Sequence, residues 1–126
     1  MVKSLKPTPA ELDLLRVLWR TGPATVKQVH QEVLQERDMA ISAVLRLLQI
    51  MHGKGLLLRD EQAKSHIYRP AQEQDSLQTG LLHQFIHKAF SGSGKDLVLA
   101  ALRGGHVTND ERKEIEAFLK SGEDRP

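Results

Sequence analysis

Three short motifs in this chain of 126 residues mark where helices begin. In each, a threonine precedes a glutamate or glutamine by three positions: Thr8 with Glu11, Thr25 with Gln28, and Thr108 with Glu111. Such a pair forms a capping box, because the threonine hydroxyl accepts a hydrogen bond from the backbone N–H three residues on. The longer side chain in turn accepts one from the threonine N–H. We therefore expect a mainly α-helical chain.

Apolar side chains recur at helical spacing through the first half of the chain and predict three short helices. The first runs from Thr8 to about Arg20, and the sequence Thr-Gly-Pro at residues 21–23 stops it. The second follows Thr25 and ends near residues 37–38. The third spans residues 40–53, and its expected buried side is Val44, Leu47, Leu48 and Met51. Short connectors between these helices are typical of a helix-turn-helix core.

The pattern changes after this third helix. Gly-Lys-Gly at residues 53–55 breaks the helix, and residues 56–59 and 66–69 have the composition of two short strands. A polar turn at 60–65 separates the strands, and Pro70 closes the second one. Three helices followed by a β-hairpin are the outline of a winged helix-turn-helix, which we assign to residues 1–71.

Residues 72–126 are expected to form a three-helix domain. Its helices begin near Asp75, cover residues 96–102, and follow Thr108. A unit of this size rarely builds an adequate core alone, so the helices must pack either on the first domain or on a second copy of the chain. We favour the second copy and hence a homodimer. The expected interface residues are Leu77, Leu81, Leu82, Phe85, Ile86, Phe90, Ile115, Phe118 and Leu119.

Charge is distributed unevenly along the chain. Residues 1–70 contain eleven Lys and Arg against seven Asp and Glu, whereas residues 71–126 contain seven against nine. A basic first half favours a polyanionic partner for that half.

Several classes of protein are excluded by composition. Without cysteine, the chain has no disulfide, thiolate nucleophile or cysteine metal site. His83 and His87 have metal-binding spacing on a helix but lack a third ligand, so we expect no metal and no cofactor. No catalytic motif occurs, which predicts that the protein is not an enzyme. No secretory signal or membrane-length apolar run is found, which predicts a cytoplasmic protein.

Seven ordered segments resemble the BlaI/MecI/CopY penicillinase-repressor family. They are TPAEL at residues 8–12, VLW at 17–19, GPATV at 22–26, VL at 44–45, LLQ at 47–49, KGL at 54–56 and HIYRP at 66–70. The resemblance implies a winged-helix domain, a helical dimerisation domain, and repression of transcription from palindromic operator DNA. It also implies control of β-lactam-response genes, and hence antibiotic resistance, together with the repressor's own operon.

The family also implies a mode of release. In its best-known members, a membrane sensor metalloprotease cuts an Asn-Phe bond in the short helix after the first dimerisation helix. The register places this bond at Ala100 and Ala101, where both flanking side chains differ. The copper-responsive branch uses cysteine ligands, which this chain lacks.

In this fold the third predicted helix, residues 40–53, would enter the major groove of DNA. Its expected DNA-facing residues are Ser42, Ala43, Arg46 and Gln49. Arg46 can bond guanine, Gln49 can bond adenine or a phosphate, and Ala43 can contact only a thymine methyl group. Phosphate contacts are expected from Thr8, Thr25, Lys27, Lys54, Lys64 and Arg69.

Some residues depart from the family pattern or oppose DNA binding. Asp60 and Glu61 would repel phosphates near the hairpin. Ser42, Ala43 and Ile50 replace residues that are usually Thr, Lys or otherwise polar in the family, so the family's operator sequence does not transfer. A winged-helix protein-interaction module with weak or no sequence-specific DNA binding therefore stays open as the alternative.

Overall fold

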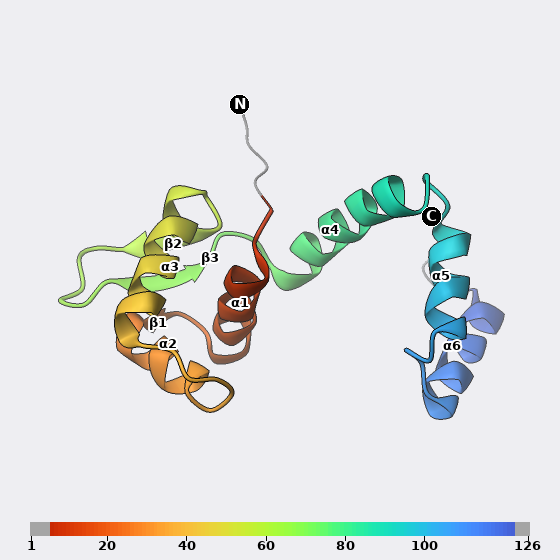
Figure 1. The fold of residues 1–126 in the computed structure, drawn as a ribbon, viewed down its shortest axis with the longest axis horizontal. Helices are drawn as coiled ribbons and strands as arrows, with labels where there is room; N and C mark the ends of the chain where they lie inside the picture. Colours follow the sequence, from red (N-terminus) through yellow and green to blue (C-terminus); the bar gives the residue numbers. More distant parts are fainter. Residues whose placement is uncertain (1–5, 123–126) are drawn as a thin grey trace. The chain divides into compact units, whose positions relative to one another are not determined.

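The computed structural model describes residues 6–122 (Figure 1). The chain divides into two compact units between Leu81 and Leu82. The first unit contains α1 (Pro9–Thr21), β1 (Ala24–Thr25), α2 (Val26–Val33), α3 (Ile41–Gly53), β2 (Leu57–Asp60) and β3 (Ile67–Pro70). Helices α4 (Gln74–Ala89), α5 (Gly94–Arg103) and α6 (Asn109–Ser121) follow. The mainly helical architecture with a β-hairpin after the third helix is thus confirmed. No helix among the described residues has the length and apolar character needed to cross a membrane.

All three predicted capping boxes are confirmed. The hydroxyl oxygens of Thr8, Thr25 and Thr108 accept hydrogen bonds from the backbone N–H groups three residues on, at 3.2, 3.3 and 3.1 Å. The side chains of Glu11, Gln28 and Glu111 accept the reciprocal bonds at 3.0, 2.9 and 2.9 Å. The predicted stop after α1 is also confirmed, because Gly22 caps the helix with a φ of 91° that favours glycine.

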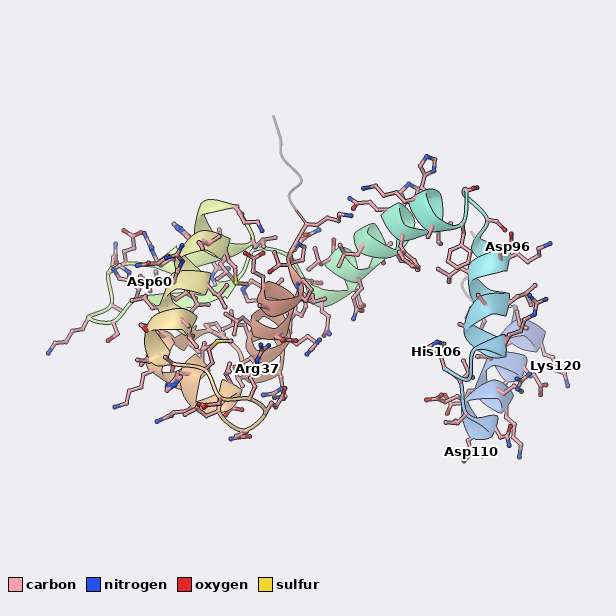
Figure 2. The ribbon with its side chains drawn as sticks, viewed as in Figure 1. Arg37, Asp60, Asp96, His106, Asp110 and Lys120 are labelled. Carbon is pink, nitrogen blue, oxygen red and sulfur yellow. The ribbon has the colours of Figure 1, made fainter. Side chains whose placement is uncertain are left out.

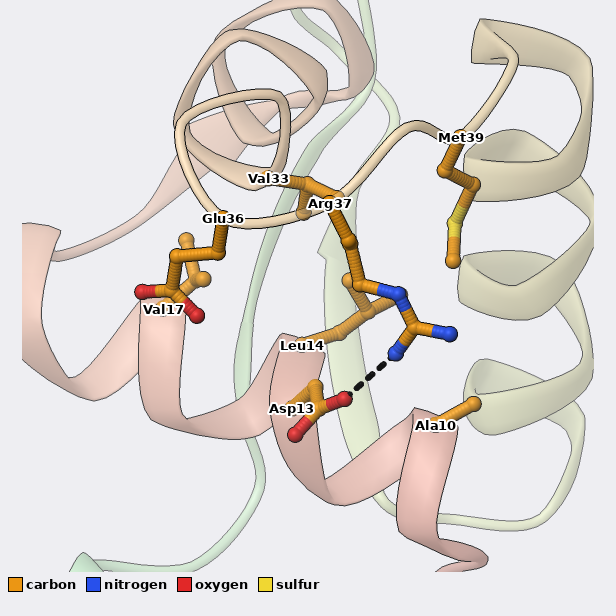
Figure 3. Close-up of a pocket in the computed structure, with 8 residues that line it drawn as sticks. All are labelled: Ala10, Asp13, Leu14, Val17, Val33, Glu36, Arg37 and Met39. Carbon is orange, nitrogen blue, oxygen red and sulfur yellow. Dashed lines mark hydrogen bonds and ion pairs between the residues drawn. The ribbon is translucent and has the colours of Figure 1, made fainter.

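Helix α2 is shorter than the sequence pattern predicted. It ends at Val33, about one turn before residues 37–38. The following turn is held from outside the helix: Arg37 Nη1 donates to Asp13 Oδ2 of α1 at 2.7 Å (Figure 3). His30 Nε2 lies 2.9 Å from the carbonyl oxygen of Met39. The contacts of His30 and Arg37 direct the chain after Val33 away from the helix axis.

The sheet contains a strand that the sequence analysis missed. Its order is β1-β3-β2, with antiparallel pairing throughout. The predicted hairpin is present, but both strands lie one residue further along the chain than expected. Strand β1 pairs Ala24 with Tyr68 and Thr25 with Ile67. A strand of two residues is too short to show the alternation of apolar and polar side chains. Local sequence therefore could not reveal this strand, whose partner lies more than forty positions away.

The core of the first unit lies between the helices and the sheet. Its fully buried large side chains are Leu14, Leu15, Leu18, Val29, Val44, Leu48, Met51, Leu57 and Tyr68. Three of the four residues predicted for the buried side of α3 are among them, and Leu47 is half-buried. Leu77 of α4 packs against this core, and Trp19 Nε1 donates to the carbonyl oxygen of Gln72 at 3.0 Å. The first turn of α4 is therefore part of the first unit.

The second unit lacks a buried core of its own. Within residues 82–122 no side chain is fully buried. Ser93 caps α5 and Thr108 caps α6, with Asp96 and Asp110 in the first turns of these helices (Figure 2), where carboxylates interact favourably with the helix dipole. Phe85 and Phe90 meet edge to face, with ring centroids 5.8 Å apart. Local signals thus define the helices, but burial within one chain does not explain their stability.

A buried ion pair joins the beginning of α1 to the end of α3. Glu11 is 3% exposed, and its Oε1 accepts a hydrogen bond from Lys54 Nζ at 2.6 Å. Burial raises the pKa of Glu11, but the bonds from Lys54 and from the Thr8 N–H outweigh this effect and lower the pKa below 4.5. The charged carboxylate therefore stabilises the fold.

This pair predicts a pH-dependent effect of Glu11→Gln, which keeps an acceptor for the Thr8 N–H but removes the charge opposite Lys54. We expect the variant to lower the free energy of unfolding at neutral pH by about 1–3 kcal/mol. A lowered carboxyl pKa stabilises the fold above the unfolded pKa, and this contribution is lost as the pH falls through the folded pKa. The difference from wild type should therefore shrink below a pH of about 4.5, as measured by urea unfolding.

The matched control is Glu61→Gln, which removes an exposed carboxylate from the hairpin. Its effect on the free energy of unfolding should be smaller, because solvent screens exposed ion pairs. An effect of Glu11→Gln that is the same at neutral and acidic pH would contradict the role of the charge.

Candidate nucleic-acid interface

The exposed side of α3 presents the residues that the sequence analysis assigned to DNA. Val44, Leu48 and Met51 anchor the helix in the core, and this fixes which side faces outward. The predicted DNA-facing residues are all exposed: Ser42, Ala43, Arg46 and Gln49. The sequence of α3 contains no aspartate or glutamate. Its outward side therefore offers donors and apolar groups without a carboxylate to repel phosphates.

Ion pairing divides the cations of the first unit into two groups. Between residues 7 and 70, five cations bind carboxylates: Arg16, Arg20, Arg37, Lys54 and Arg59. The remaining four are exposed and have no carboxylate partner in the part of the chain that the structure describes: Lys27, Arg46, Lys64 and Arg69. The four come from α2, α3 and the hairpin. All four are residues that the sequence analysis proposed for DNA contact.

Lys54 has a different role in the structure from the other proposed phosphate-binding residues. Its ammonium is bound to Glu11 and also donates to the carbonyl oxygen of Lys6 at 3.4 Å. The side chain is only 21% exposed. A phosphate contact would compete with a buried carboxylate, so Lys54 is better placed to hold α3 than to bind DNA.

The hydroxyl groups of the two capping threonines, Thr8 and Thr25, can still donate a hydrogen bond. The hydroxyl oxygens of Thr8 and Thr25 accept backbone N–H groups, as described above. A hydroxyl both donates and accepts, so each keeps a proton that it can donate to a phosphate oxygen. Thr8 is exposed and Thr25 half-buried.

The hairpin carries both signs of charge, and the structure neutralises part of the negative charge. Arg59 Nε donates to Glu61 Oε2 at 2.8 Å, and this bond lowers the pKa of Glu61. The Arg59 guanidinium also lies over the Tyr68 ring, 6.0 Å from its centroid. Asp60 (labelled in Figure 2) shapes the turn by accepting a bond from the Gln62 N–H at 3.0 Å. The expected repulsion of phosphates by Glu61 is thus reduced by Arg59, a residue that the sequence analysis did not single out.

The residues proposed for dimerisation differ in their surroundings. Leu82, Phe85, Phe118 and Leu119 are 47%, 55%, 46% and 70% exposed. Four others are half-buried: Leu81, Ile86, Phe90 and Ile115. Leu77 packs against the core of the first unit instead.

The proposed cleavage site, Ala100 and Ala101, lies inside α5, where Ala100 is exposed and Ala101 half-buried. No group of three metal-ligating side chains is present among the described residues.

Comparison with known proteins relates this arrangement to one family. Residues 7–121 match the family model described as penicillinase repressor. The transcriptional regulator BlaI of Mycobacterium tuberculosis is 31% identical over 125 residues, which cover 97% of this chain and 91% of that protein. The methicillin resistance regulatory protein MecI of Mammaliicoccus sciuri is 22% identical over 117 residues, covering 93% of this chain and 95% of that protein.

A solved structure shares the fold. It is the solution structure of monomeric Bacillus licheniformis BlaI in complex with the blaP half-operator. The alignment has a TM-score of 0.51 at 20% identity and covers 60% of this chain and 92% of that chain.

Proposed function

Since the chain belongs to the penicillinase repressor family, we propose that it represses transcription as a homodimer bound to palindromic operator DNA in the cytoplasm. The family consists of transcriptional repressors and not of enzymes. We propose β-lactam-response genes and the repressor's own operon as its targets, because its relatives are named for penicillinase and methicillin resistance.

The pattern of unpaired cations is the observation that carries the DNA-binding proposal. Four exposed cations on α2, α3 and the hairpin lack carboxylate partners, whereas five others in the same unit are neutralised within the chain. Unpaired cations attract phosphates and release counterions when they bind. An interaction module for an uncharged protein surface would not need them.

The four cations have different proposed tasks. Arg46 lies on the outward side of α3, where it can donate to guanine O6 and N7 together in the major groove. Lys27, Lys64 and Arg69 are proposed to contact phosphates, which hold the protein on the duplex without reading sequence.

This division predicts different effects for Arg46→Ala and Lys64→Ala. The first should cost about 1–3 kcal/mol at one base position and relax the preference there. The second should weaken binding to all duplexes alike and reduce the salt dependence of the affinity. Affinities for a preferred and a scrambled duplex, measured by fluorescence anisotropy at several salt concentrations, separate the two effects. If Arg46→Ala weakens both duplexes equally, Arg46 does not read a base.

Dimerisation is supported by the second unit's lack of a core. No residue from 82 to 122 is fully buried, and large apolar side chains of α4 and α6 are exposed. Burying this surface against an identical set would form a self-complementary two-fold interface. A two-fold dimer that presents two copies of α3 would prefer an inverted repeat with half-sites about one helical turn apart.

We therefore expect wild-type protein to be a dimer at micromolar concentration and Phe85→Asp to disrupt it. The variant would bury a charge among apolar side chains and give monomers or unfolded protein. Sedimentation together with circular dichroism distinguishes these outcomes. His83→Asp, which introduces the same charge at an exposed position of α4, is the matched control and should stay dimeric. A monomeric wild-type protein would refute the interface.

For release of the repressor, we propose that a cut between Ala100 and Ala101 would be effective. It would detach residues 101–126 and with them α6, which supplies Phe118 and Leu119 to the proposed interface. The remaining monomer would hold a single half-site weakly. The proposed agent of the cut is a membrane sensor metalloprotease. Such a protease either accepts the small side chains of Ala100 and Ala101 or cleaves this bond slowly. The alternative is that release proceeds without cleavage.

A protease pocket shaped for a large aromatic side chain would lose its anchor at Ala101. The loss of several methylenes corresponds to about 1–3 kcal/mol of selectivity, or about 10–200-fold in rate. For a protease with such a pocket, Ala101→Phe should accelerate cleavage accordingly when the protein is expressed with its genomic neighbours and induced with a β-lactam. The masses of the fragments are then measured. A fragment that ends at Ala100 supports cleavage at this bond, whereas derepression of the operon with the chain intact contradicts it.

A further inference from the structure

The outward side of α3 carries apolar side chains that nothing in the described chain covers. Ile41, Leu45 and Ile50 are 46%, 38% and 41% exposed, and Ala43 is also exposed. Single exposed apolar residues are common on protein surfaces. A helix with apolar residues both on its core side and on its outward side is normally covered on both. This outward side of α3 is therefore expected to meet a partner.

Two of the exposed side chains share a stripe with Arg46. Ala43 precedes Arg46 by three positions and Ile50 follows it by four, so the three lie along one side of the helix. Ser42 and Gln49, at four positions before and three after, lie on the other side of Arg46. Around Arg46 the exposed face of α3 is thus divided: its nearest neighbours on one side are apolar, and those on the other side are polar.

Charge and chemistry indicate which partner fits this divided face. Arg46 has no carboxylate partner among the described residues, and α3 contains no acidic residue. The major groove offers acceptors on guanine for Arg46 and, on thymine, a 5-methyl group that is apolar. Neighbouring side chains on a helix are about 5–6 Å apart, less than two base-pair steps of about 3.4 Å. A methyl group one or two base pairs from the guanine therefore lies within reach of Ile50.

We propose that Ile50, together with Ala43, reads the 5-methyl groups of thymines beside the guanine contacted by Arg46. This inference rests on the proposed function, because it assigns a base preference to the same helix. It makes Ile50 a specificity-determining residue, although it is not a hydrogen-bonding one. The burial of one methyl group against an apolar side chain changes an affinity about fourfold.

Deoxyuridine tests this proposal, since it removes the 5-methyl group of thymine and leaves base pairing unchanged. The full chain is first used to enrich duplexes from a random-sequence pool. Each thymine of an enriched duplex is then replaced singly, and Kd is measured by fluorescence anisotropy. We expect about fourfold weaker binding at one or two thymines of each half-site, within two base pairs of the guanine sensed by Arg46. In Ile50→Ala this penalty should largely disappear.

Leu34→Ala is the matched control, because Leu34 is 47% exposed and lies outside α3. It should keep the wild-type penalty. Equal binding of thymine and deoxyuridine duplexes by wild type, or an unchanged penalty in Ile50→Ala, overturns the inference and leaves the proposed DNA binding intact. A change of assembly state in Ile50→Ala with an unchanged penalty would assign this face to a protein, which also overturns it. Failure to enrich any duplex overturns the proposed function as well.

Discussion

The ion pair between Glu11 and Lys54 is the constraint on which the arrangement of the first unit depends. The Glu11 carboxylate completes the cap of α1 by accepting a hydrogen bond from the Thr8 N–H. It also binds the ammonium of Lys54, the residue directly after α3. The start of the first helix and the end of the third are therefore fixed to the same buried group. Val44, Leu48 and Met51 hold the body of α3 on the core, so the direction of its outward side follows from both contacts. The orientation of the candidate DNA-binding side chains is thus set by residues that do not face DNA.

Other ion pairs within the first unit also hold cations in place. Asp13 binds both Arg16 and Arg37, Glu32 binds Arg20, and Glu61 binds Arg59, so these carboxylates hold cations within the chain. Exposed ion pairs of this kind contribute little stability. Their consequence for binding is larger, because they determine which cations stay available to a polyanion. The second unit differs in that its large apolar side chains lack a buried core within the chain.

Local signals allowed much of this structure to be predicted from the sequence. The threonine caps, Gly22 after α1 and the two hairpin strands are each encoded within a few neighbouring residues. What the sequence did not reveal depends on contacts between distant segments. Arg37 leaves the helical path because Asp13 holds it, β1 exists because Tyr68 and Ile67 pair with it, and Lys54 is occupied because Glu11 is buried beside it. The exposure of Ile50, in contrast, follows from the side on which Val44, Leu48 and Met51 anchor α3, and helical spacing predicted that side.

The position of β1 also bears on which surfaces of the chain can associate. An unpaired strand edge is a template for edge-to-edge association with another molecule. Ala24 and Thr25 pair with Tyr68 and Ile67 on one edge of β3, and β2 pairs along the whole of its other edge. The strands at the two rims are short: β1 has two residues, and β2 has four and carries Arg59 and Asp60, features that disfavour further strand addition. The sheet thereby offers little free strand edge, so self-association through the apolar helices need not compete with strand addition.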